Sequence, residues 1–175
     1  MTIQISFELS DSDLEHFRAL MQVAIAKASK YTPAQVLEKA RAVCSEMENS
    51  SLPDFVKVRL ESLETLISAL EDEEWQMPEQ EVTEILTSLA YFSEPHDLVP
   101  DNIPGLGYID DAIMIELVIQ DLSQDLNAYQ QFCNFRTTEE NRRGAEANVN
   151  RASWLEGKRT ELRSNMRRGR RLFSR

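Results

Sequence analysis

The sequence predicts an all-α protein, a single bundle of about six helices. Apolar residues recur at spacings of three and four along most of the chain, which is the period of an amphipathic helix. Glycine and proline are scarce, and three of the six prolines and two of the five glycines fall between Ser93 and Glu116. With 175 residues and 42% hydrophobic content, the chain is long enough to form one domain with a buried core.

The elements follow from this spacing. Residues 3 to 9 alternate between apolar and polar, which predicts a short N-terminal extended segment. Ser12 with Glu15 forms a capping-box pattern for the first helix, and Thr32-Pro33 marks the start of the second. The acidic run at residues 71–74 is typical of a solvated, fraying helix end. The predicted helices span residues 11–30, 32–49, 52–70, 78–92 and 108–135, with a weaker sixth from Thr137 or Thr138.

The helix at 108–135 is expected to lie at the centre. From Ala112 to Ile119 every residue except Glu116 is apolar, so other helices should surround it. The sixth helix has only a thin apolar stripe. Its propensity is lowered by Gly144, Asn148, Asn150 and Gly157.

A proline- and glycine-rich loop joins the fourth and fifth helices. Pro95, Pro100 and Pro104 prevent a helix from continuing through it, while Gly105 and Gly107 allow tight turns. Because the loop also carries apolar residues, we expect a compact and partly buried connection.

The loop carries a family resemblance. It reads Asp-Leu-Val-Pro-Asp at residues 97–101 and Ile-Pro-Gly-Leu-Gly-Tyr-Ile-Asp-Asp at residues 103–111. These motifs resemble the YkvA-like family, a bacterial domain of unknown function with a helix–loop–helix core, over residues 85–119. The sequence departs from the family at His96 and Asn102, where relatives more often carry apolar or aromatic residues. The resemblance implies a core fold and a bacterial source, not an activity.

Charge divides the chain into two parts. Residues 158–175 hold eight basic residues and one acidic residue, a net charge of +7, while the other 157 residues carry 11 basic and 29 acidic residues, a net charge of −18. We therefore expect a helical domain at residues 1–157, with the YkvA-like core motif at 85–119, and a basic, flexible tail at 158–175. The acidic body disfavours nucleic acid as its partner.

Two groups of charged residues are candidate sites. Asp97, Asp101, Asp110 and Asp111 are oxygen ligands of the kind that Mg²⁺ or Ca²⁺ prefers, and a metal there would activate water. The favoured interpretation is structural, because Asp110 and Asp111 fall in a first helical turn and the other two adjoin prolines. Without a metal at these residues, no cofactor is expected.

The second group is the basic tail. Arginine suits the phosphates of lipids or nucleic acids, and the residues expected to contact phosphate or a membrane are Arg163, Arg167, Arg168, Arg170 and Arg171. The alternative is that the tail folds onto an acidic face such as residues 71–74, in the same chain or another.

No motif of a known catalytic site is present, including GxSxG, HExxH and the Walker loop. The sequence favours a non-catalytic interaction or scaffold module, cytoplasmic and peripheral to the inner membrane through its tail, that binds an unknown protein partner or itself. The alternatives are a metal-dependent enzyme that uses the loop aspartates and a nucleic-acid-associated protein that binds through the tail.

Cys44 and Cys133 are isolated, which is typical of reduced thiols.

Overall fold

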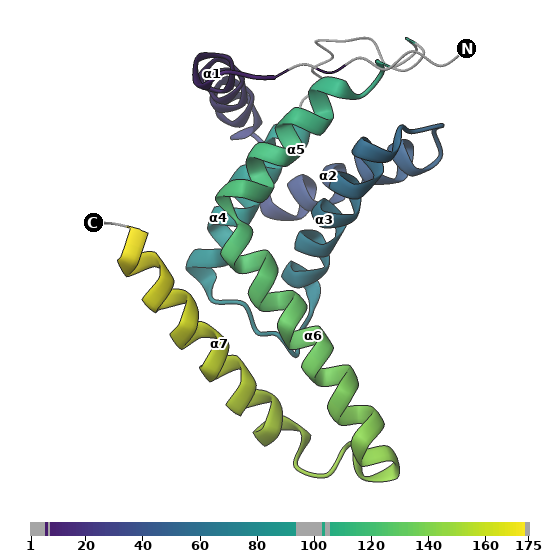
Figure 1. The fold of residues 1–175 in the computed structure, drawn as a ribbon, viewed down its shortest axis with the longest axis vertical. Helices are drawn as coiled ribbons and strands as arrows, with labels where there is room; N and C mark the ends of the chain where they lie inside the picture. Colours follow the sequence, from purple (N-terminus) through teal and green to yellow (C-terminus); the bar gives the residue numbers. More distant parts are fainter. Residues whose placement is uncertain (1–5, 7, 94–102, 104–105, 174–175) are drawn as a thin grey trace. The chain divides into compact units, whose positions relative to one another are not determined.

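The computed structural model describes residues 6, 8–93, 103 and 106–173. These residues form helices and no strand, which confirms the all-α prediction (Figure 1). The described part of the chain has seven α-helices, one more than expected, and their arrangement as one bundle remains a prediction. The helices are α1 (Asp11–Ala28), α2 (Pro33–Glu48), α3 (Asp54–Glu71), α4 (Glu79–Leu89), α5 (Ile109–Asp121), α6 (Ser123–Arg143) and α7 (Arg151–Phe173), with short 3-10 helices η1 (Ala90–Ser93) and η2 (Gly144–Glu146).

Capping boxes start the first two helices. The cap of α2 is Thr32, as expected, with Gln35 as its reciprocal partner and proline in the first turn. The expected cap of α1 at Ser12 was wrong. Ser10 is the N-cap, and the Asp13 side chain accepts a hydrogen bond from the Ser10 backbone N–H at 2.8 Å. Aspartate replaces the expected glutamate in that reciprocal role, and the helix begins at Asp11, the residue at which the predicted range began.

The predicted helix at residues 108–135 is two helices. α5 ends at Asp121, Leu122 takes φ −105° and ψ 18°, and α6 begins at Ser123. Asp121 and Ser123 have low helix propensity because their side chains compete for backbone hydrogen bonds, which favours a break here. The apolar stretch in α5 is buried as expected, including Met114 and Ile115 at 0% exposure.

The boundary expected at Thr137 was also wrong. α6 continues through both threonines to Arg143, since nothing there removes a backbone hydrogen bond. It ends at Gly144, whose φ of 56° is a left-handed value that glycine adopts at little cost. Asn150, with φ 52°, precedes α7.

Helix α7 passes through Gly157 without interruption, so the expected domain boundary at residue 157 falls inside a helix. Residues 158–169, expected to form the start of a flexible tail, bury two apolar side chains: Leu162 is 2% exposed and Met166 is 7% exposed. Apolar side chains at this spacing, together with Leu155, give α7 a buried face that the charged composition obscured.

The chain divides into two compact units, and the division falls within α3, α4 and α5. Unit 1 comprises residues 1–60 and 86–118, and unit 2 comprises residues 61–85 and 119–175. In unit 1, α1 and α2 pack against η1, whose four residues are all buried. In unit 2, α6 packs along α7 (Figure 1).

Two predicted elements fall largely outside the described residues. These are the extended segment at residues 3–9, of which only residues 6, 8 and 9 are described, and most of the proline- and glycine-rich loop. At the end of that loop, Tyr108 has a φ of 64°, and its hydroxyl shares a hydrogen bond of 3.0 Å with the Ser50 hydroxyl. Glu116, which interrupts the apolar run of α5, forms an ion pair of 2.9 Å with Arg59.

Candidate functional site

Unit 2 contains a cluster of charged side chains around the turn between α3 and α4, residues 72–77. Asp72 shapes this turn, because its Oδ1 accepts hydrogen bonds from the backbone N–H groups of Glu74 at 3.0 Å and Trp75 at 3.2 Å. Gln76 has φ 51°, an unfavourable value for a residue with a side chain. The turn therefore depends on contacts from other elements to keep its conformation.

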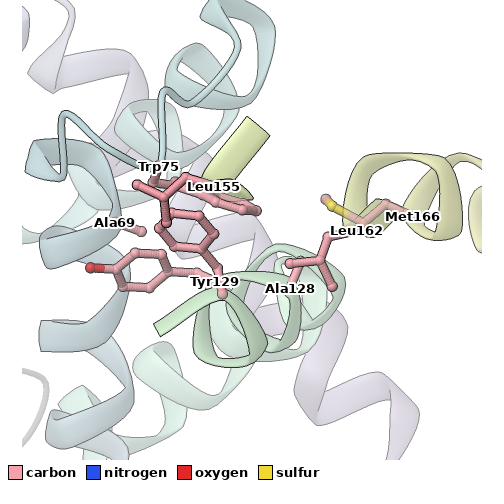
Figure 2. Packing of buried hydrophobic residues seen from close by; sticks show 8 residues of the cluster. Ala69, Trp75, Ala128, Tyr129, Leu155, Leu162 and Met166 are labelled. Carbon is pink, nitrogen blue, oxygen red and sulfur yellow. The ribbon is translucent and has the colours of Figure 1, made fainter. Parts of the chain in front are cut away.

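Trp75 anchors the turn in the apolar core of unit 2. It is 1% exposed, and its ring lies 5.0 Å from the ring of Phe132 and 5.9 Å from that of Tyr129, centroid to centroid. Figure 2 shows Trp75, Tyr129 and Leu155 packed together, with Leu162 and Met166 of α7 against Ala128 of α6. The acidic residues 71–74 are thus followed directly by a side chain of the buried core.

Two carboxylates of the turn bind arginines from α6 and α7. Asp72 pairs with Arg136 at 2.8 Å and accepts a hydrogen bond from the Tyr129 hydroxyl at 3.0 Å. Glu74 pairs with Arg136 at 3.1 Å and with Arg151 at 2.5 Å. The expectation that residues 71–74 form only a solvated helix end is therefore wrong for Asp72 and Glu74.

The ionisation of these groups follows from the contacts. Burial alone would raise the pKa of Asp72, but hydrogen bonds from Arg136 and Tyr129 outweigh it and lower the pKa below its ordinary value. Hydrogen bonds from Arg151 likewise lower the pKa of Glu74 below its ordinary value. Burial raises the pKa of the Tyr129 phenol, and the adjacent Cys133 and Asp72 add to that shift. Both carboxylates therefore stay charged in the fold at neutral pH.

Two further arginines of α7 bind the backbone of the turn. Arg159, only 4% exposed, donates to the Glu74 carbonyl at 2.6 Å and pairs with Glu156. Arg163, one helical turn later, donates to the carbonyls of Trp75 at 2.9 Å and of Gln76. We call Arg136, Arg151, Arg159 and Arg163 the arginine cluster. It supplies the contacts that hold the strained turn. Its two members from the predicted basic tail, Arg159 and Arg163, bind backbone carbonyls of the turn, while the carboxylates of Asp72 and Glu74 are bound by Arg136 and Arg151, which precede that tail.

The remaining candidate arginines differ from this cluster. Arg167 and Arg168 are exposed, and neither forms an ion pair within the part of the chain that the structure describes. Arg170 and Arg171 continue the same helix, but their side chains are outside the described residues. Arg163 and Arg167 line the same pocket, of about 230 Å³, beside the start of α4. The structure therefore brings together two of the five predicted phosphate contacts.

The loop aspartates are only partly described. Asp97 and Asp101 lie outside the described residues, while Asp110 and Asp111 stand in the first turn of α5, with Asp110 2% exposed and Asp111 half-buried. Within residues 6, 8–93, 103 and 106–173, no three side chains of histidine, cysteine, aspartate or glutamate converge as metal ligands would. Whether the four aspartates share a metal remains a prediction.

Comparison with known proteins gives one match. Residues 82–117 match the model of a family described as a protein of unknown function, DUF1232. The YkvA-like family is a DUF1232 family, so the resemblance in the loop motifs is confirmed. No curated protein and no solved structure matches the chain. Among the described residues, no helix has the length and apolarity needed to cross a bilayer.

Proposed function

We propose from the chemistry of α7 that this protein, whose residues 82–117 match the model of a family of unknown function, is a non-catalytic interaction module that binds an anionic membrane surface. The contact is made by the last turns of α7. The observation that carries the proposal is the division of the α7 arginines into two groups with different surroundings.

The first group serves the fold. Arg151, Arg159 and Arg163 use their guanidinium groups on the 72–77 turn, and the charges of Arg151 and Arg159 are also paired with carboxylates within the chain. Because a paired and partly buried arginine attracts external anions weakly, Arg151 and Arg159 contribute little to binding at a bilayer surface.

The second group faces solvent. Arg167 and Arg168 are exposed, and the sequence after Glu161 holds six arginines and no acidic residue. Each basic residue near an anionic bilayer contributes about 1 kcal/mol to binding, so this end of the helix supports a weak, salt-sensitive attachment. The opposite charge of the rest of the chain orients the molecule, since its acidic surfaces are repelled by the same bilayer.

Flotation with vesicles tests the proposal. The full-length protein should bind vesicles that contain phosphatidylglycerol and should not bind vesicles of phosphatidylcholine alone. The double substitution Arg167→Gln with Arg168→Gln removes about 2 kcal/mol, or about thirtyfold in the partition coefficient. Substitutions are preferable to truncation after residue 157, which would also remove the buried Leu162 and Met166.

The matched control is Lys57→Gln on α3, which removes one positive charge, as each of the two arginine substitutions does, at another exposed site. It should leave binding within about twofold of wild type, because long-range charge alone is screened at physiological salt. Equal binding to both vesicle types would remove the proposal. Binding to duplex DNA that exceeds vesicle binding at the same salt would replace it with a nucleic-acid partner.

A further inference from the structure

The pocket beside the start of α4 has the chemistry of an anion site. It lies within unit 2, has a volume of about 230 Å³, and is formed by the beginning of α4 and one face of α7. Its walls carry two cations, Arg163 and Arg167, one anion, Glu81, and the apolar side chain of Met166. The six lining residues are Pro78, Gln80, Glu81, Arg163, Met166 and Arg167.

Arg163 differs from the other members of the arginine cluster. Arg136, Arg151 and Arg159 each pair with at least one carboxylate, whereas the hydrogen bonds of Arg163 among the described residues go only to carbonyl oxygens. The Arg163 guanidinium also lies 5.3 Å from the centroid of the Trp75 ring. Its Nε is buried and has no hydrogen-bond acceptor in that part of the chain. Burial lowers the pKa of Arg163, although the charge of Glu81 opposes that effect. A half-buried cation without a paired anion is costly, so an external anion would stabilise it.

The rest of the pocket adds to this attraction. Arg167 stands one helical turn after Arg163, on the same side of α7, so the two positive charges lie close together. The first turn of α4 borders the pocket, and the backbone N–H groups of a first turn favour a negative charge. Glu81 acts in the opposite direction and limits the affinity.

We propose that this pocket binds the phosphate group of a phosphate ester, with Arg163 and Arg167 as the residues that bind it. Arginine presents a planar set of donors that matches phosphate oxygens. The inference rests on the proposed function in one respect: a lipid headgroup is one source of such a phosphate, and a free phosphate ester is the other.

Nuclear magnetic resonance of the arginine Nε–Hε groups in the full-length protein tests the site directly. Titration with glycerol phosphate should shift the Arg163 resonance to saturation, and Arg163→Lys, which removes that group, assigns it. Arg167→Gln should weaken binding by about tenfold or more, the effect of losing a charged hydrogen-bond partner. Glu81→Gln should strengthen binding because it removes the repulsive charge.

The control is Arg168→Gln, an adjacent exposed arginine that does not line the pocket. It should leave glycerol phosphate binding unchanged, although it weakens vesicle binding as much as Arg167→Gln does. Absence of a saturable shift of the Arg163 resonance would overturn the site. Equal losses of glycerol phosphate affinity in Arg167→Gln and Arg168→Gln would also overturn it.

The vesicle experiment and the glycerol phosphate experiment test the two proposals separately. Glycerol phosphate binding without vesicle binding supports the pocket, assigns its ligand to free phosphate esters and removes the membrane proposal. Vesicle binding without a saturable glycerol phosphate shift leaves the membrane proposal standing and overturns the pocket.

Discussion

Replacement of Asp72 by alanine tests how the 72–77 turn is held. One carboxylate serves four partners: the backbone N–H groups of Glu74 and Trp75, the Tyr129 hydroxyl and the Arg136 guanidinium. The Asp72 side chain is only 11% exposed, so water replaces these contacts poorly. Alanine therefore removes the turn's internal cap and its connection to α6 together.

The contacts set the expected loss of stability. Loss of a capping side chain costs about 1 kcal/mol, and a buried hydroxyl left without its acceptor costs about 1 to 3 kcal/mol. Arg136 keeps its second partner, Glu74, so the full cost of an unpaired buried charge does not apply. We expect Asp72→Ala to lower the free energy of unfolding by about 3 kcal/mol. Asp72→Asn, which keeps one oxygen for the cap, should lower it by about half as much.

Urea unfolding monitored by tryptophan fluorescence measures this loss of stability in unit 2. Both tryptophans, Trp75 and Trp154, lie in unit 2, so the signal reports on the region that the substitution affects. Glu73→Ala is the matched control, because it removes an exposed carboxylate from the same turn and should change stability by less than about 0.5 kcal/mol. If Asp72→Ala costs no more than Glu73→Ala, the turn is not held by this network.

Two more predictions use the same unfolding measurement. The folded-state pKa values of Asp72 and Glu74 lie below their ordinary values of 3.8 and 4.5, so these groups stabilise the fold above that range and lose their contribution as the pH falls through the lowered values. Acid should therefore weaken the wild type more steeply than Asp72→Asn, and parallel pH profiles would contradict this linkage. Leu162→Ala should cost about 2 to 5 kcal/mol because the side chain is 2% exposed, whereas the exposed Thr160→Ala should cost less than about 0.5 kcal/mol. Equal stabilities would show that this part of α7 is a free tail.

Local sequence signals predicted most of the helices. Periodicity located α1 to α4, and the Thr32-Pro33 pair marked the start of α2 correctly, because caps and apolar spacing are properties of neighbouring residues. The breaks were harder to predict. The break at Leu122 has no proline or glycine to mark it, whereas the two threonines at 137 and 138 suggested a helix start that the structure lacks.

The charged cluster could be predicted only in outline. The basic segment at residues 158–175 and the acidic run at residues 71–74 have opposite charges. One of the two interpretations of the basic segment was therefore that it folds onto this acidic run. The sequence could not show which arginines bind the turn, because the partners are more than 60 residues apart. Composition also concealed Leu162 and Met166 among arginines, so a helical face was interpreted as a flexible tail.

The central claim is that the α7 arginines have two roles, one inside the fold and one at an anionic surface. The most direct test compares how Arg159→Gln and Arg168→Gln partition onto vesicles that contain phosphatidylglycerol, at a temperature where both proteins are folded. The account predicts that Arg168→Gln loses about fivefold in binding, while replacement of Arg159, a residue that is only 4% exposed, leaves binding at the wild-type level. Equal losses for the two variants would show that the net charge of the helix, and not the division of its arginines, governs binding.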